Sequence, residues 1–182
     1  GLLRPTSGTI KILGRDITQL TDDENMDMRK TFGVLFQYAA LFDDMSVLEN
    51  VMFPLNEHRR DLSMAQRKEI AYKKLTQAGL VEQHYSKLPS EISGGMRKRC
   101  GLARALALDP DILVYDEPTT GLDPVLTEMV DNLIVETHNH KKGSTTLVVS
   151  HDLHAAFRIG DYIVMLDAGK VLLEGVPQVF FD

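Results

Sequence analysis

The sequence contains little that would crosslink the chain or anchor it in a membrane. Its 182 residues include one cysteine, Cys100, and no tryptophan. A single cysteine excludes an internal disulfide and is typical of a protein from a reducing compartment. No apolar run approaches the ~20 residues of a membrane-spanning helix. The first residues, Gly1-Leu2-Leu3-Arg4-Pro5, do not resemble a secretory leader. We therefore expect a cytoplasmic protein.

The chain also has no excess of basic residues. Its 20 Lys and Arg against 26 Asp and Glu give a net charge of −6, which argues against a nucleic acid as partner. The histidines have no Cys or carboxylate partners at metal-ligand spacing, so a structural zinc site is not expected. The length suits one globular domain with a sizeable core.

A third absence concerns phosphate binding. No segment has the form G-x-x-x-x-G-K-[ST], the glycine-rich loop that cradles nucleotide phosphates. The one Gly-Lys pair, Gly169-Lys170, is followed by Val171 and lies in a predicted hairpin turn. This absence matters because other segments have the chemistry of a nucleotide-hydrolysing site.

Strands and helices alternate in the second half of the chain. Apolar runs predict strands there, and cap residues, glycines and helical periodicity predict the helices between them, which together indicate a parallel α/β sheet. The predicted strands cover residues 9–13, 31–36, 112–115 and 146–149, a hairpin covers 162–173, and helices cover 94–108, the segment after 123–124, and 152–157.

The middle of the chain interrupts this alternation. Ser46 and Ser63 each stand three residues before a Glu or Gln, the capping-box spacing at the start of a helix. The first helix is predicted to stop near Pro54 and the second to end at Gly79. We expect one domain over residues 1–182, in which a helical subdomain, 39–102, is inserted into a core of 1–38 and 103–182.

Two adjacent carboxylates follow the predicted strand 112–115. Asp116 and Glu117 precede Pro118, and the carboxyl ends of parallel strands face the ligand crevice. There Asp116 is suited to hold Mg²⁺ through water. Glu117 is suited to deprotonate the water that attacks a γ-phosphate, a role typically worth ~10²–10⁴ in rate. Taken alone, a pair of acids that simply ends a strand is an equally good interpretation.

A serine and two glycines begin the predicted helix 94–108. At Ser93-Gly94-Gly95 the free backbone N–H groups and the helix dipole favour an anion, and glycine lets a phosphate approach closely. Without further context a serine N-cap with a flexible glycine pair is the simpler explanation. The basic run Arg97-Lys98-Arg99 is interpreted as a solvated helix face rather than a phosphate clamp.

Three more polar residues lie at strand ends or helix starts. His151 can donate a hydrogen bond to a γ-phosphate, and the Gln37 amide can reach both Mg²⁺ and the attacking water. Asp123, within Gly121-Leu122-Asp123-Pro124, is an N-cap. Each also has an ordinary structural explanation, so the choice between a functional and a structural interpretation depends on the order of the motifs along the chain.

That order resembles the ATPase domain of ABC transporters. Gln37 corresponds to its Q-loop, Ser93-Gly94-Gly95 to the signature motif, Asp116-Glu117 to Walker B, Gly121-Leu122-Asp123-Pro124 to the D-loop and Ser150-His151 to the H-loop. The resemblance runs from about Gly1 to Phe181. It implies a P-loop NTPase-type (RecA-like) α/β fold with a mostly parallel sheet, and ATP and Mg²⁺ as ligands.

A narrower resemblance lies in the segment from Phe32 to Phe42, in Asn50-Val51 and in the run from Ser93 to Arg99, which are similar to the ATPases of Mla/MCE-type lipid transporters. It implies ATP-driven movement of phospholipid or another hydrophobic substrate across the bacterial envelope. The implied partners are a second ATPase subunit, a membrane permease and an MCE-type lipid-binding component, at the inner face of the cytoplasmic membrane. Tyr38, Ala39, Leu41 and Phe42 either face the permease or simply pack inside the helical subdomain.

The resemblance also distributes the residues over two nucleotides of a head-to-tail homodimer. Ser93, Gly94 and Gly95 would cover the partner's ATP, whereas the chain's own ATP would be served by Gln37, Asp116, Glu117 and His151. Asp123 would contact the partner across the interface.

The Walker A region of this family is absent from the 182 residues. We expect the chain as printed to be a truncated ATPase that neither binds ATP tightly nor hydrolyses it, with one sheet face uncovered. One alternative is a non-catalytic subunit that lends its signature motif to a complete partner. A DNA-repair-type ATPase of the same superfamily is disfavoured by the acidic charge and by the short segment between Gln37 and Ser93.

Overall fold

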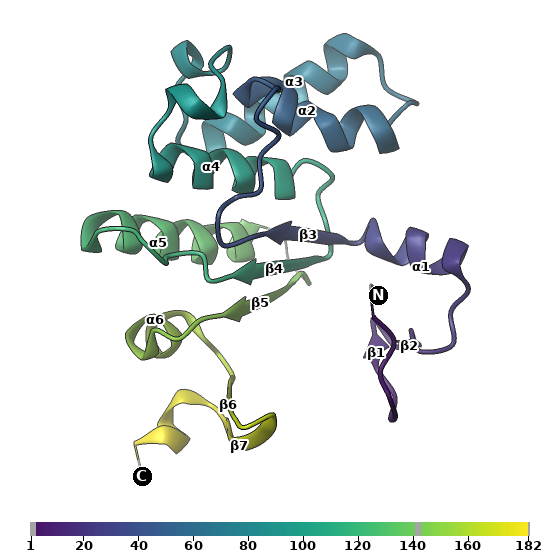
Figure 1. Ribbon diagram of the computed structural model, residues 1–182, viewed down its shortest axis with the longest axis vertical. Helices are drawn as coiled ribbons and strands as arrows, with labels where there is room; N and C mark the ends of the chain where they lie inside the picture. Colours follow the sequence, from purple (N-terminus) through teal and green to yellow (C-terminus); the bar gives the residue numbers. More distant parts are fainter. Residues whose placement is uncertain (1–2, 141–142, 182) are drawn as a thin grey trace.

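The computed structural model describes residues 3–140 and 143–181 (Figure 1). Gly1 and Leu2, where the sequence predicts the end of a helix, lie outside the described residues. The elements in chain order are β1 (Lys11–Ile12), β2 (Arg15–Asp16), α1 (Asp22–Arg29), β3 (Phe32–Leu35), α2 (Val47–His58), α3 (Met64–Gln77), α4 (Gly94–Ala105), β4 (Ile112–Asp116), α5 (Pro124–His140), β5 (Thr145–Val149), α6 (Leu153–Ile159), β6 (Ile163–Asp167) and β7 (Lys170–Gly175), with short 3-10 turns η1 (Glu82–His84), η2 (Pro89–Glu91) and η3 (Pro177–Phe180).

Strands β3, β4 and β5 form a parallel sheet in that order, which confirms the predicted α/β class. Leu35 lies opposite Tyr115, and Asp116 lies opposite Val149. The three carboxyl ends therefore meet at one edge, and the arrows in Figure 1 point the same way. The other strands form two antiparallel hairpins, β1-β2 and β6-β7, which Figure 1 shows set apart from the sheet.

One face of the parallel sheet is buried, and the other is exposed along β5. Leu35, Leu113 and Tyr115 belong to a core cluster that also contains Val130 and other residues of α5 and α4. On β5, by contrast, Leu147 is 54% exposed and Val149 48% exposed. Parallel sheets are usually covered on both faces, so this exposure is unusual.

Helices α2, α3 and α4 build a second core beyond the sheet (Figure 1). Helix α4 belongs to both cores, since Cys100 and Ala103 contact the helical cluster, whereas Leu102 and Leu106 belong to the sheet cluster. Position 102, where the sequence predicts the end of the helical subdomain, therefore lies inside α4.

The predicted end of α2 near Pro54 is wrong, because the helix continues to His58. Proline removes one backbone hydrogen bond from a helix and is usually found at its end. Here the flanking residues Val51 and Leu55 are completely buried against the helical cluster. Packing of an apolar face contributes more to helix stability than local propensity does, so the helix passes through the proline.

The connection from β3 to α2 is held by Asn50 and Arg104. Asn50 is completely buried, accepts from the Phe42 N–H at 2.8 Å, and donates to the Phe42 and Met45 carbonyls at 3.0 Å each. Arg104 donates to the carbonyls of Ala39 and Ala40, at 2.7 and 2.8 Å.

These contacts also separate the apolar residues that follow Gln37. Ala39 is buried in the sheet cluster and Leu41 packs against both clusters, so these two serve packing. Tyr38 is 80% exposed and Phe42 39% exposed. Only these two remain available to a partner.

Candidate functional site

The carboxyl edge of the sheet brings four of the predicted residues together. Asp116 is the last residue of β4 and Glu117 follows it, while Gln37 and His151 each come two residues after the ends of β3 and β5. The strand register places all of these positions at the same edge. The sheet therefore brings together the positions that the sequence assigns to one nucleotide.

Glu117 and His151 are in direct contact. His151 Nδ1 lies 2.8 Å from Glu117 Oε2, and the hydroxyl of Thr120 donates to the same oxygen at 2.9 Å. The Glu117 side chain is 21% exposed and that of His151 is 77% exposed. The carboxylate of Glu117 is therefore held in place by two hydrogen bonds, while most of the His151 imidazole is exposed to solvent.

The backbone of Glu117 has an unusual conformation. Its φ of +48° lies in the left-handed region, which a residue with a side chain rarely adopts. The Glu117 N–H donates to the Val149 carbonyl at 2.9 Å, so β5 holds this turn. Outliers of this kind cluster at functional sites, which supports a role for Glu117 beyond ending a strand.

The electrostatics of the pair follow from these contacts. The hydrogen bond to Glu117 and the nearby negative charge raise the pKa of His151 above its ordinary value. Burial works to raise the pKa of Glu117, but the hydrogen bonds from His151 and Thr120 outweigh it, and that pKa is lowered. Glu117 is therefore ionised at neutral pH and able to accept a proton.

Asp116 and Gln37 are the candidates for Mg²⁺. Asp116 is exposed and Gln37 half-buried at the same edge. Within the described part of the chain, no group of three or more His, Cys, Asp or Glu is arranged to hold a metal ion. Mg²⁺ commonly takes one or two carboxylates and completes its shell with water and phosphate oxygens. A carboxylate and an amide oxygen fit an ion held mainly by a nucleotide.

Ser93, Gly94 and Gly95 begin α4 as the sequence predicts. The Ser93 hydroxyl accepts from the Met96 N–H at 3.3 Å, so the simple capping explanation is true, and Ser93 and Gly94 are exposed. Gly95 is buried, and a Cβ there would lie 3.3 Å from Leu126 Cδ1 on α5. The exposed start of α4 thus packs closely against the start of α5.

Asp123 is the cap of α5. Its Oδ1 accepts from the N–H groups of Val125 and Leu126 at 3.0 Å each, and the side chain remains exposed. Gly95 and Leu126 approach closely, so the helix end that Asp123 caps lies beside the helix end that Ser93 begins.

The interpretation of Arg97-Lys98-Arg99 as a solvated face is wrong for Lys98. Its side chain turns inward, is 7% exposed, and donates to the carbonyls of Pro118 and Thr120 at 2.6 and 2.8 Å. Burial lowers the pKa of Lys98, and the Glu117 charge opposes that lowering. Sequence reasoning missed Lys98 and Thr120, because a lysine within a basic run gives no signal of burial.

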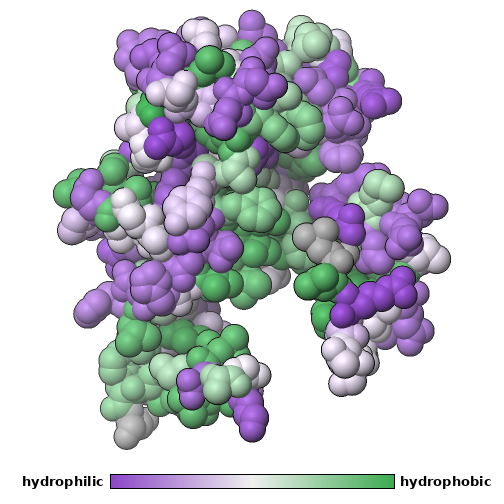
Figure 2. All heavy atoms as spheres, in the orientation of Figure 1, coloured by the Kyte–Doolittle hydropathy of each residue, from purple (hydrophilic) through white to green (hydrophobic). Residues whose placement is uncertain are grey.

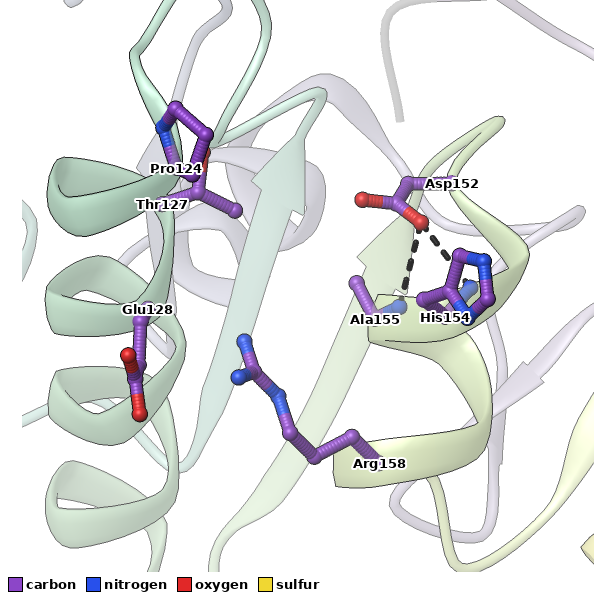
Figure 3. Close-up of a pocket in the computed structure, with 7 residues that line it drawn as sticks. All are labelled: Pro124, Thr127, Glu128, Asp152, His154, Ala155 and Arg158. Atoms are coloured by element: carbon purple, nitrogen blue, oxygen red, sulfur yellow. Dashed lines mark hydrogen bonds between the residues drawn. The ribbon is translucent and has the colours of Figure 1, made fainter.

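A cavity of about 390 Å³ between α5 and α6 contains none of the predicted residues (Figure 3). Asp152 at its rim accepts from the N–H groups of His154 and Ala155, which caps α6. Arg158 pairs with the buried Asp131 of α5. Asp152 therefore serves to cap α6, and Arg158 joins α6 to α5.

Comparison with known proteins gives the family. Residues 1–120 match the family described as "ABC transporter". Over 179 residues the chain is 43% identical to the probable ribonucleotide transport ATP-binding protein mkl of Mycobacterium tuberculosis, covering 98% of this chain and 49% of that protein. Over 178 residues it is 41% identical to the intermembrane phospholipid transport system ATP-binding protein MlaF of Haemophilus influenzae, covering 98% and 66%.

The chain thus spans about half of mkl and about two thirds of MlaF. A solved dimer of the ATP-binding cassette MJ0796, in a post-hydrolysis state with ADP and Pi, has a TM-score of 0.86 at 35% identity. That alignment covers 97% of this chain and 76% of the cassette. It confirms the predicted P-loop NTPase-type fold with a mostly parallel sheet. The chain belongs to the ABC transporter family.

Proposed function

We propose that the chain is part of the ATP-hydrolysing subunit of an ABC transporter. The observation that carries the proposal is the hydrogen bond of 2.8 Å between Glu117 and His151, at the sheet edge that also holds Asp116 and Gln37. Family membership supplies the reaction class, and this constellation supplies a carboxylate placed to act on water.

Each residue at this edge has a role in the proposed hydrolysis. Glu117, ionised and held by Thr120 and His151, accepts a proton from the attacking water. His151 orients that carboxylate by a hydrogen bond from Nδ1. Its other ring nitrogen, Nε2, is then free to donate a hydrogen bond to the γ-phosphate when the ring is protonated. Asp116 and Gln37 would hold Mg²⁺, which when bound neutralises charge on the phosphates.

A second subunit completes the proposed arrangement. The exposed Ser93 and Gly94 at the start of α4, with buried Gly95 behind them, offer backbone N–H groups and a helix dipole to a phosphate. We propose that this surface covers the nucleotide of a second copy and that Asp123 contacts that copy. The dimer of the cassette MJ0796 supports such an assembly.

We further propose that the transporter moves a hydrophobic substrate such as phospholipid. Its other proposed components are a permease and an MCE-type lipid-binding protein. MlaF, named for phospholipid transport, supports this substrate, whereas mkl, equally similar, is named for ribonucleotide transport. No described helix is both long and apolar enough to cross a bilayer. We propose that the ATPase subunit lies at the inner face of the cytoplasmic membrane, where it binds the permease. Proteoliposomes with the tagged ATPase and its captured membrane subunits should move labelled phospholipid with ATP. Uptake of ribonucleotide instead would contradict the lipid assignment.

The test of hydrolysis is Glu117→Gln in the protein made from its complete reading frame. Removal of the proton acceptor should lower kcat by roughly 10²–10⁴ while ATP binding persists. The matched control is Glu69→Gln, on the exposed surface of α3, which should hydrolyse at the wild-type rate. Unchanged turnover in Glu117→Gln would contradict the assignment.

The polypeptide of residues 1–182, made alone, should not hydrolyse ATP, because it contains no loop and lysine to hold the phosphates. Turnover by that polypeptide would overturn this expectation. The alternative of a signature-lending subunit is less well supported, since such a subunit would not need the bond between Glu117 and His151.

A further inference from the structure

Lys98 is a buried cation with two main-chain partners. It lies in α4, five residues after Ser93, and its ammonium group donates to the Pro118 carbonyl at 2.6 Å and the Thr120 carbonyl at 2.8 Å. A buried ammonium must replace its lost water with such acceptors. The two bonds therefore fix the segment 118–120 against α4.

The same segment carries the candidate base. Thr120 offers its carbonyl to Lys98 and its hydroxyl to Glu117 Oε2, at 2.8 and 2.9 Å. Glu117 in turn contacts His151. A continuous path of hydrogen bonds thus leads from the helix that Ser93 begins to the carboxylate at the sheet edge.

A second contact supports this connection. Gly95 packs against Leu126, so the start of α4 touches α5 just beyond the segment that Lys98 holds. Two residues with positive φ flank the segment that Lys98 holds, Glu117 with φ +48° before it and Gly121 with φ +77° after it. A segment with such backbone angles needs outside contacts to stay in one shape.

We propose that Lys98 is a positioning residue for hydrolysis, which places Glu117 relative to the start of α4 through the carbonyls of Pro118 and Thr120. The proposal rests on the function proposed above, in which Glu117 accepts the proton. If binding of the partner's nucleotide displaces Ser93, the displacement then also moves Glu117, which acts on the chain's own nucleotide.

The test compares three variants in the protein made from its complete reading frame. Lys98→Met keeps the bulk of the side chain and removes the donors and the charge, whereas Lys98→Gln removes the charge and keeps N–H donors. Lys73→Met, at an exposed position of α3, is the matched control. ATPase rates and amide hydrogen exchange are measured on the same preparations.

For Lys98→Met, kcat should fall at least about tenfold with little change in KM for ATP, because a displaced base slows the reaction without weakening binding. Amides of residues 117–122 should exchange about tenfold faster, while those of α2 and α3 stay protected. Lys98→Gln should recover most of both properties, and Lys73→Met should match the wild type.

Three results would overturn the proposal. These are wild-type kcat in Lys98→Met, no recovery in Lys98→Gln, and a uniform rise in exchange over the whole chain, which would make Lys98 a general stability residue. A wild-type protein without ATPase activity would instead refute the proposed function. In that case the local exchange in Lys98→Met still decides whether Lys98 fixes the segment.

Discussion

At the residue scale, Glu117 combines a strained backbone with a restrained side chain. Its left-handed φ is held by the bond to Val149, and its carboxylate by Thr120 and His151. Strain of this kind costs about 1–3 kcal/mol and persists only where neighbours fix it. The contacts around Glu117 therefore determine both its geometry and its charge.

The pair of Glu117 and His151 should produce a defined pH dependence. The pKa of His151 is raised from 6.5, so its contribution to stability is full below pH 6.5 and is lost as pH rises through the folded pKa. The pKa of Glu117 is lowered from 4.5, so its contribution is present above pH 4.5 and is lost as pH falls through the folded pKa. The pair stabilises the fold most between these limits.

Replacing Glu117 by Gln should therefore lower the pKa of His151, because the neutral amide gives up the charge that favours imidazolium. Titration of the ring proton signals by NMR, with chelator present, measures this change. Glu69→Gln on α3 should leave the curve in place. An unshifted His151 in Glu117→Gln would show that the two side chains do not interact in solution.

At the element scale, the connection between β3 and α2, which contains Gln37, is held by side chains of two helices. Ala39 and Ala40 both have left-handed φ angles, of 63° and 45°. The guanidinium of Arg104 holds both of their carbonyls, and Asn50 holds the turn that follows. Two side chains from helices thus set the path of a connection that lacks regular structure.

Asn50→Ala should destabilise the fold by about 3 kcal/mol, because it leaves the Phe42 N–H and several carbonyls without their buried partner. Urea unfolding measures the change. Asn132→Ala, at an exposed position of α5, should alter stability by less than about 0.5 kcal/mol. Equal stabilities of the two variants would show that water replaces the Asn50 amide.

The sequence predicted those elements whose signals are local. The capping boxes at Ser46 and Ser63 are present, and the turn of the last hairpin has positive φ at Ala168 and Gly169, as a two-residue hairpin turn of this type requires. Where long-range packing decides, prediction failed. Pro54 stays helical because α3 and α4 bury its neighbours, and Lys98 is buried by a loop twenty residues away.

The candidate site shows the same division. Strand ends located Asp116, Glu117, Gln37 and His151, since a parallel sheet gathers its carboxyl ends at one edge. Thr120 could not be predicted as a partner of Glu117, because that contact depends on the left-handed turn at Glu117 itself.

At the scale of the whole molecule, exposed hydrophobic side chains are concentrated in its C-terminal third. Leu147 and Val149 are exposed on β5, and large apolar residues are exposed on β6, β7 and the end that follows them. Figure 2 shows hydrophobic side chains gathered over this C-terminal part. Exposed apolar surface of this extent favours association.

The polypeptide of residues 1–182 should therefore self-associate at high concentration, and Leu147→Thr with Val149→Thr should weaken that association. Threonine retains the preference for a strand while removing apolar surface. Light scattering during size-exclusion chromatography measures the effect. Val81→Thr, which removes an exposed apolar side chain from the loop after α3, is the control and should change nothing. Equal association of both variants would exclude the β5 surface.

Helix α4 contributes side chains to two cores on opposite sides, and a Cβ at Gly101 would lie only 2.9 Å from both Ala39 and Leu35. A helix wedged in this way cannot roll about its own axis without breaking both cores. If the helical layer moves relative to the sheet, α4 must stay rigidly with one layer and slide along the other. Gly101, which has no side chain to block Leu35 of β3, would then lie in the surface along which the two layers slide.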